Sequence, residues 1–142
     1  MAEILRQERP KIVFAPYWDD AHPDHIVANF LSVAGVFTSR LTKIDIVGEP
    51  YRPNKVINYF ASHLRCNPST SFVLDITDLF EGKMEAVKCY RSQFFASERG
   101  QWVVDFIETN AKYWGSMIGV KYGEIFCTKE NVGLKSIRAL VF

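Results

Sequence analysis

A short apolar run between two prolines, followed by a polar loop and a helical pattern, most constrains what this chain can fold into. Residues 11–15, Lys-Ile-Val-Phe-Ala, lie between Pro10 and Pro16 and predict a buried strand. The polar and aromatic residues 17–25 predict a loop. From Pro23 onward apolar residues recur every three or four positions, which predicts a helix whose first turn tolerates proline. A strand, a loop and a helix in this order form the repeating unit of an α/β sheet protein.

Periodicity and turn residues predict the other elements. They are a helix over 1–9, strands over 55–62 and 72–76 with a turn at 65–70 between them, a helix that begins at a capping box of Asp78 and Glu81 and continues to Phe94, a helix over about 100–117 that ends at Gly119, and a strand over 120–126. Most aromatic side chains stand at helical spacing, so we expect them in the core. Ligand sites of α/β proteins lie at the carboxyl ends of several strands. Because one strand alone is followed by a suitable polar loop, we expect strand–loop units of the domain to be missing.

Composition excludes several classes of protein. The 142 residues fit one domain, and 48% apolar with 23% charged residues is ordinary for a globular protein. A net charge of +1 without a basic run argues against nucleic-acid binding. The apolar stretches are too short to span a membrane, and the charged start is unlike a signal peptide, so we expect a cytoplasmic protein. Cys66, Cys89 and Cys127 form no CxxC pair, which argues against a disulfide framework or a cysteine zinc site.

The residues that carry chemistry gather in the loop before the helix. Residues 19–25, Asp-Asp-Ala-His-Pro-Asp-His, hold two histidines and three carboxylates. Such groups bind zinc or stabilise charge on a reacting oxygen, and a position at the carboxyl end of an apolar strand favours a ligand site. The alternative is a capped helix start without chemistry. A catalytic zinc needs three protein ligands, and the remaining histidine, His63, lies in an unrelated segment. We therefore expect this chain not to complete a zinc site alone.

Residues 11–16 followed by His22-Pro-Asp-His25 resemble the second signature of the PIG-L/LmbE deacetylases, which remove the acetyl group from N-acetylglucosamine conjugates. Four later segments resemble, in order, the branch that deacetylates N-acetylglucosaminyl-malate in bacillithiol synthesis: 73–76, 83–86, 90–94 and 119–126. The resemblance implies an α/β, Rossmann-like PIG-L deacetylase fold. Residues 1–142 would form a single partial domain that lacks the N-terminal segment with the Ala-His-Pro-Asp-Asp motif.

The resemblance also implies roles for individual residues. His25 would bind Zn²⁺ or another divalent metal, and Asp24 would orient a neighbouring group. His22, as an imidazolium, would stabilise charge on the acetyl oxygen or donate a proton. The expected substrate contacts are Trp18 and Asp20 in the loop and Tyr122 and Glu124 in the late segment. Ser92 and Gln93 are further candidates, for which helical packing is an equally good explanation.

Two departures from the family pattern matter. The Ala-His-Pro-Asp-Asp loop supplies the other metal ligands and the general base, and it is absent here. Many relatives carry arginine where this chain has Ala21, which bears on any contact to an acidic aglycone such as malate.

Three hypotheses remain open. The chain is part of a deacetylase and inactive alone, or it is a catalytically incomplete sugar- or metal-binding module or oligomerising remnant, or it is an unrelated α/β protein whose loop is structural. The family implies a small amino-sugar conjugate as substrate and a homo-oligomer, a trimer or hexamer. A truncated domain would also expose sheet surface and associate with itself.

Overall fold

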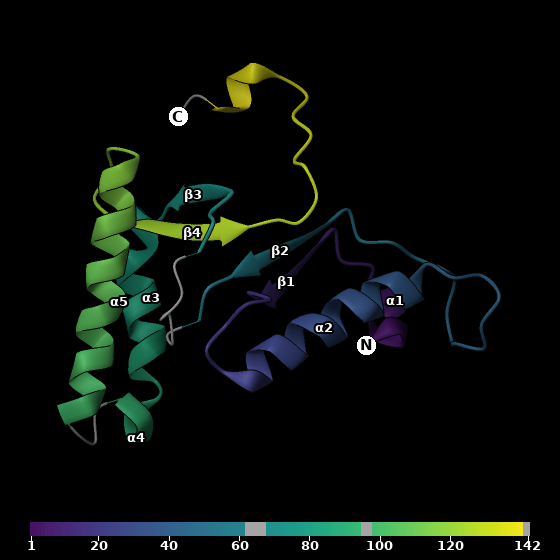
Figure 1. Ribbon diagram of the computed structural model, residues 1–142, viewed down its shortest axis with the longest axis horizontal. Coiled ribbons are helices and arrows are strands. Elements are labelled where there is room, and N and C mark those ends of the chain that lie inside the picture. Colours follow the sequence, from purple (N-terminus) through teal and green to yellow (C-terminus); the bar gives the residue numbers. More distant parts are fainter. Residues whose placement is uncertain (62–67, 95–97, 141–142) are drawn as a thin grey trace. The chain divides into compact units, whose positions relative to one another are not determined.

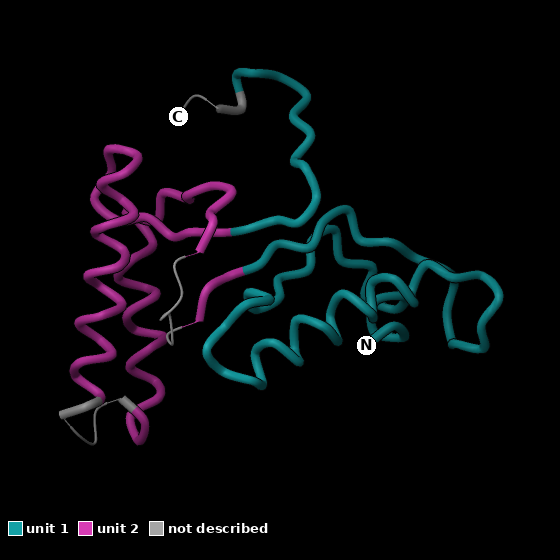
Figure 2. The backbone as a smooth tube through the Cα atoms, viewed as in Figure 1, with its two compact units in different colours: residues 1–58, 127–142 teal, residues 59–126 magenta. Residues whose placement is uncertain are grey.

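The computed structural model describes residues 1–61, 68–94 and 98–140 (Figure 1). These residues form two compact units (Figure 2). The first comprises residues 1–58 and 127–142, and the second comprises residues 59–126. The expectation of a single domain stays a prediction. His63, Cys66 and the first part of the turn expected at 65–70 lie outside the described residues.

The first unit contains the predicted order of helix, strand, loop and helix. Its elements are α1 (Ala2–Glu8), β1 (Ile12–Pro16), α2 (Pro23–Ser39) and β2 (Lys55–Tyr59), which ends at the boundary of the unit. β1 and β2 are neighbours in the sheet, and α2 packs against both α1 and β1. The sequence predictions for these elements are confirmed, except that the strand expected over 55–62 ends at Tyr59 and does not include residues 60 and 61. Residue 62 lies outside the described residues.

A buried arginine fastens the long loop after α2 to the first helix. The Arg6 side chain is 5% exposed, and its guanidinium donates hydrogen bonds to four backbone carbonyls. The acceptors belong to Ser39, Leu41, Ile46 and Gly48, at 3.0, 2.5, 2.6 and 2.8 Å respectively. Carbonyls that secondary structure leaves unpaired need such a donor when they are buried. Arg6 therefore gives order to a segment that has no helix or strand of its own.

The helix α2 buries a different face from the one that its apolar pattern indicates. The residues it buries are small or polar, namely Asn29, Ser32, Gly35 and Ser39. The apolar residues Ile26, Val27, Phe30, Leu31 and Phe37 are exposed. The expectation that aromatic residues at helical spacing lie in the core is therefore wrong for Phe30 and Phe37, and it is also wrong for Tyr90, Trp102 and Tyr113 of the second unit, which are exposed. The small face wins because it lets α2 approach α1 closely: a Cβ on Gly35 would lie 2.3 Å from the Met1 side chain.

The second unit pairs two antiparallel strands with helices. Its elements are β3 (Phe72–Asp75), the 3-10 helix η1 (Thr77–Leu79), α3 (Phe80–Lys88), α4 (Arg91–Phe94), α5 (Glu98–Met117) and β4 (Gly123–Cys127), which ends at the unit boundary. A further 3-10 helix, η2 (Ile137–Leu140), follows in the first unit. Phe72 lies opposite Phe126 in the β3–β4 register. The core of the second unit consists of Ile76, Phe80, Ala111 and Tyr122.

Two predictions for this unit are wrong. Asp78 does not cap α3, because it lies inside η1 and the apolar Leu79 is the N-cap residue. The turn begins earlier, where the Asp75 carboxylate accepts the Thr77 backbone N–H at 2.9 Å. The helix expected to reach Phe94 also ends early. Tight backbone hydrogen bonds at its end, from Cys89 to Ala86 and from Tyr90 to Val87, close α3 before α4 begins.

The end of α5 lies against the start of β4 with backbone in contact with backbone. A Cβ on Gly115 would lie 2.8 Å from the Tyr122 nitrogen, and one on Gly123 would lie 2.7 Å from the Gly115 nitrogen. The predicted end of the helix at Gly119 is confirmed by its left-handed φ of 78°. This close backbone contact fixes the position of the start of β4 against the end of α5.

Candidate active site

Asp20 is the centre of the polar loop between β1 and α2. Its side chain is 5% exposed, and its two oxygens have separate partners. Oδ1 accepts the backbone N–H of His22 at 2.9 Å, and Oδ2 lies 3.0 Å from Nδ1 of His25. One carboxylate thus holds both the loop backbone and the His25 ring. This contact places a carboxylate beside Nδ1, so Nε2 is the ring nitrogen that would face a metal.

His22 is the N-cap residue of α2. Its Nδ1 accepts the backbone N–H of Asp24 at 3.2 Å, so the proton of the neutral ring lies on Nε2. The capped helix start that we considered as an alternative is therefore present. It does not exclude chemistry, because the ring of His22 also stacks on the ring of His25 with a centroid distance of 4.9 Å. The structure brings the two predicted histidines together on one side of the helix start.

Asp24 and Asp20 have different surroundings from those that we expected. The Asp24 side chain is 87% exposed, and its carboxylate lies 3.9 Å from Nδ1 of His22. The carboxylate that touches the predicted metal ligand His25 is that of Asp20, which we had placed among substrate contacts. The orienting role of Asp24 stays a prediction. Sequence spacing held no sign of the Asp20–His25 contact, because the five-residue separation closes only through the turn.

Two buried asparagines hold the end of β1 below this loop. The carbonyl of Pro16 accepts the side-chain N–H groups of Asn29 on α2, at 2.6 Å, and Asn58 on β2, at 3.0 Å. The sequence analysis missed both residues. The available signal was a carboxamide, Asn29, among the apolar residues of the helical pattern, since a buried amide needs a partner. The two bonds join three elements at the point where the loop begins.

Trp18 has aromatic and cationic neighbours within the first unit. Its ring lies 4.3 Å from that of Tyr17, and the ammonium group of Lys129 lies 4.8 Å from the Trp18 ring centroid. This distance is typical of a cation–π contact. Lys129 therefore brings a positive charge to the loop that carries both histidines.

The two predicted contacts from the late segment belong to the second unit. Tyr122 is buried, stacks on Phe80 at 3.8 Å and has its hydroxyl 3.4 Å from Glu108. The Glu124 carboxylate accepts a hydrogen bond from the Lys83 ammonium at 2.7 Å. Their contact with a substrate stays a prediction. Ser92 and Gln93 are exposed on α4, and their role is likewise a prediction.

Hydrogen bonds lower the pKa of two carboxyl groups in the second unit. The Thr77 hydroxyl and backbone N–H lower the pKa of Asp75. The Lys112 ammonium lowers the pKa of Glu108, and a hydrogen bond from the Tyr122 hydroxyl lowers it further. Glu108 in turn raises the pKa of Lys112. These are effects of charge-assisted hydrogen bonds at the surface.

The described residues fit one ligand of a metal and not a complete set. His25 is an oriented imidazole, as zinc ligands commonly are. Among residues 1–61, 68–94 and 98–140, no three His, Cys, Asp or Glu side chains are grouped so that they could hold a metal ion. A catalytic zinc has three protein ligands.

Comparison with known proteins gives this geometry a context. No family model matches the chain. The diacetylchitobiose deacetylase of Thermococcus kodakarensis is 30% identical over 128 residues, which cover 85% of this chain and 46% of that protein. The N,N'-diacetylchitobiose deacetylase of Pyrococcus horikoshii, solved with an inhibitor, is 34% identical with a TM-score of 0.72 over 89% of this chain and 48% of that one. The chain is homologous to these deacetylases.

Two further solved structures share the fold. The conserved protein TT1542 of Thermus thermophilus is 34% identical, with a TM-score of 0.81 over 94% of this chain and 57% of that one. GalB, the 4-carboxy-2-hydroxymuconate hydratase of Pseudomonas putida, has a TM-score of 0.74 at 15% identity over 96% of this chain and 59% of that one, which shows the fold alone. The homology supports the resemblance to the PIG-L/LmbE deacetylases. The chain spans about half the length of the relatives it matches.

Proposed function

We propose that this chain is part of a zinc-dependent deacetylase that hydrolyses the acetamide of an N-acetylglucosamine conjugate. The contact between Asp20 and His25, placed at the end of β1, carries the proposal. The similarity to two diacetylchitobiose deacetylases supports an N-acetylglucosamine-type substrate. A fold shared with a hydratase does not select a chemistry, so the proposal depends on the residues of the loop.

The residues of the loop would have different roles in such a reaction. Asp20 lies beside Nδ1 of His25, and Nε2 of the same ring would bind the metal. His22, fixed by its cap bond, carries its proton on Nε2 and stabilises the negative charge that develops on the acetyl oxygen. Asp24 remains a proposed orienting group next to His22.

We propose Zn²⁺, or another divalent metal, as the cofactor, with His25 as the ligand that this chain supplies. When bound, zinc supplies Lewis-acid chemistry: it polarises the acetyl carbonyl and lowers the pKa of a water molecule. The other ligands and the general base would come from residues outside the described set. On this proposal the isolated chain binds zinc weakly and is inactive.

A cation beside the loop supports an acidic aglycone, as in the bacillithiol branch. Ala21 stands where many relatives carry arginine, but Lys129 lies over the Trp18 ring of the same loop. An ammonium group at this place would attract a carboxylate on the substrate. A small amino-sugar conjugate as substrate, a cytoplasmic location and assembly into trimers or hexamers belong to the same proposal. No helix in the described part of the chain has the length and apolar character needed to cross a membrane.

A chimeric enzyme tests the activity. This chain replaces the matching segment of the Thermococcus deacetylase, and acetate release from diacetylchitobiose is measured. We expect turnover that His25→Ala abolishes and that Asp20→Asn reduces about tenfold to a hundredfold, as for other residues that orient metal ligands. The matched control Asp19→Asn changes an exposed carboxylate in the same loop and should leave turnover intact. A folded chimera whose activity is indifferent to His25→Ala would refute the assignment.

Zinc titration of the isolated chain tests the proposal that His25 is the one metal ligand this chain supplies. Isothermal titration should give weak binding that weakens further in His25→Ala. Tight one-to-one binding would mean that the chain completes its own metal site, and the proposal of missing ligands would be abandoned.

The alternative is an incomplete sugar- or metal-binding module, or an oligomerising remnant. The exposed apolar face of α2 favours the last of these, because contiguous apolar surface marks an interaction site. Acetate release by the chimera would argue against a remnant without chemistry.

A further inference from the structure

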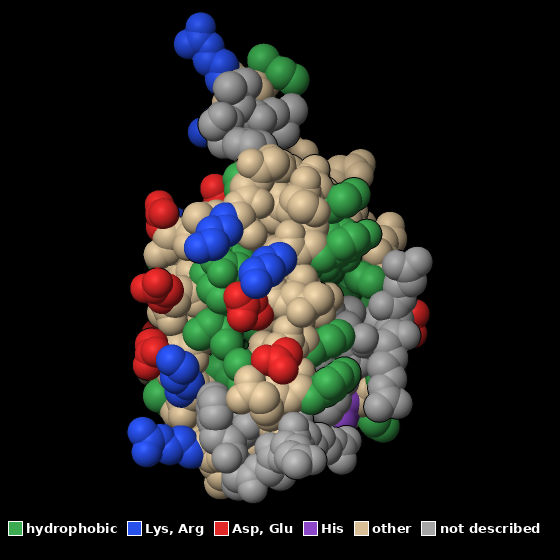
Figure 3. Space-filling model, turned by 90° about the vertical axis from the view of Figure 1, so that its left-hand side faces the viewer, with side chains coloured by type: hydrophobic (Ala, Val, Ile, Leu, Met, Phe, Trp, Pro, Cys, Tyr) green, Lys and Arg blue, Asp and Glu red, His purple; other side chains and the backbone are tan. Residues whose placement is uncertain are grey.

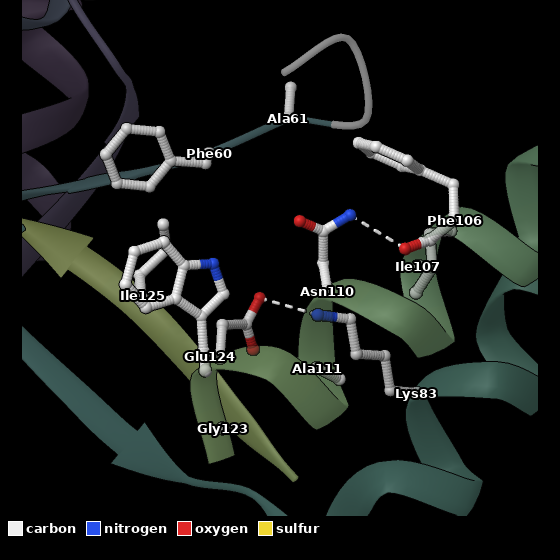
Figure 4. Close-up of a pocket in the computed structure, with 11 residues that line it drawn as sticks. Phe60, Ala61, Lys83, Phe106, Ile107, Asn110, Ala111, Gly123, Glu124 and Ile125 are labelled. Carbon is white, nitrogen blue, oxygen red and sulfur yellow. Dashed lines mark hydrogen bonds and ion pairs between the residues drawn. The ribbon is translucent and has the colours of Figure 1, made fainter. Parts of the chain in front are cut away.

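The second unit contains a pocket of about 200 Å³ between α3, α5 and β4 (Figure 4). It is smaller than the roughly 300–1,000 Å³ of pockets for drug-sized ligands, so its volume suits a single ring with short substituents. All of the described residues that line it belong to the second unit. The pocket can therefore be assessed without reference to the histidine loop.

Polar groups of opposite character meet on one wall of this pocket. The Lys83 ammonium and the Glu124 carboxylate lie 2.7 Å apart, with about a third of each side chain exposed. Asn110 donates one N–H to the Phe106 carbonyl at 2.8 Å, and its carboxamide oxygen turns toward the Phe60 side of the pocket (Figure 4). The wall thus offers donors and acceptors to a ligand.

Charge decides what kind of ligand this wall accepts. Lys83 and Glu124 are the ionisable side chains among the described lining residues, and their charges cancel. A charged ligand would have to break their ion pair. The side chain that the ligand does not bind would then carry a charge without an opposite charge beside it, which is costly. Hydroxyl groups can instead bond to the remaining lone pairs of the carboxylate and the remaining N–H groups of the ammonium without separating them.

The other walls are aromatic. Phe60, Phe106 and Trp114 line the pocket together with aliphatic side chains. Phe60 and Phe106 lie on opposite sides of the Asn110 carboxamide (Figure 4). An aromatic wall buries an apolar ring face, while the polar wall binds groups on the rim of the ring.

We propose that this pocket binds a single neutral sugar ring, whose C–H face packs on the aromatic wall and whose hydroxyl groups bond to Lys83, Glu124 and Asn110. The inference rests on the pocket alone and holds whether or not the histidine loop is catalytic.

An NMR titration with N-acetylglucosamine tests the site. The indole N–H signal of Trp114, assigned with Trp114→Phe, should shift on titration of the intact chain. Removal of either polar partner, in Lys83→Met or Asn110→Ala, should weaken binding about tenfold, the equivalent of about 1.4 kcal/mol. Glucosamine, which is cationic, and glucuronate, which is anionic and keeps the sugar ring, should bind more weakly than the neutral sugar.

Matched variants separate this site from loss of folding and from the histidine loop. Lys88→Met removes another lysine–glutamate pair on α3, and Gln101→Ala removes another amide on α5, and neither residue lines the pocket. Both variants, and His25→Ala, should keep the affinity within about twofold, well inside the spread of surface substitutions. The proposal is overturned if no sugar binds, if charged sugars bind as well, or if His25→Ala weakens binding as much as Lys83→Met does.

Discussion

At the scale of single residues, buried polar side chains organise the first unit. Asp20 joins the loop backbone to the His25 ring, and two asparagines share the Pro16 carbonyl. Oδ1 of Asp20 and the two asparagine amides each have a hydrogen-bond partner far along the chain or across a turn. A buried polar group has a large cost when its partner is lost, so these residues control the geometry of the site.

Arg6 provides a first prediction at this scale. Arg6→Met keeps the apolar stem but leaves the carbonyls of Ser39, Leu41, Ile46 and Gly48 without their donor. Urea denaturation should show a loss of about 2–4 kcal/mol in the free energy of unfolding, because several partly buried acceptors are abandoned together.

The control for Arg6 is another arginine of the same unit. Arg40 is exposed, and its guanidinium lies 4.5 Å from the centroid of the Phe37 ring. Arg40→Met should change the free energy of unfolding by less than about 1 kcal/mol, as is usual for an exposed cation–π pair. Equal losses in the two variants would contradict the role given to Arg6.

Asp75 gives a prediction for pH. Hydrogen bonds from Thr77 lower the pKa of Asp75 in the folded state. Its stabilising contribution is therefore complete above the unfolded carboxyl pKa of about 3.9 and is lost as the pH falls through the lower folded value. Asp75→Ala should be less stable than the parent at pH 7, and the difference should shrink in acid. Denaturation curves from neutral to acid pH would refute this if the difference did not depend on pH.

At the scale of elements, helix pattern and helix burial diverge. The apolar spacing of α2 correctly predicted a helix, yet the face in contact with α1 and β1 is the one with Asn29, Ser32 and Gly35. Spacing reports that a helix can form. Which face is buried depends on how closely its neighbours approach, and small side chains permit the closest contact.

Two exposed glycines offer opposite predictions for the second unit. A Cβ at Gly82 on α3 or at Gly119 after α5 would meet no atom within 4 Å. Gly82→Ala should stabilise by about 0.5–1 kcal/mol, because alanine favours the helix. Gly119→Ala should destabilise by about 1–2 kcal/mol, because the φ of 78° is strained for an L-residue. Thermal unfolding of both variants measures the signs, and equal signs would contradict the backbone argument.

At the scale of the whole molecule, both units expose apolar side chains. α2 exposes its apolar stripe, and β1 exposes Ile12 and Phe14. In the second unit Trp102, Tyr113 and Met117 are exposed on α5. Hydrophobic side chains lie between charged ones on the face that Figure 3 shows. Apolar surface of this kind favours association, in agreement with the expectation of an oligomer, which stays a prediction.

Phe30 tests this property. Its side chain is 69% exposed on α2, so Phe30→Ser should reduce self-association in sedimentation velocity while it changes the free energy of unfolding by less than about 0.5 kcal/mol. Phe80→Ser is the contrasting variant, since Phe80 lies in the core against Tyr122 and its loss should cost about 3–5 kcal/mol. If Phe30→Ser associates as strongly as the parent chain, the apolar face of α2 is not the surface through which the chain associates.

The sequence by itself determined the order of the elements around the loop and the two histidines that lie together at its end. Local rules suffice there, because Pro10, Pro16 and Pro23 punctuate the chain and apolar spacing separates strand from helix. Only the tertiary structure decided that Asp20 holds His25 and that α2 buries its small face. Those outcomes depend on how a turn closes and on how near two elements come, and neither quantity is encoded in the spacing of residues along one segment.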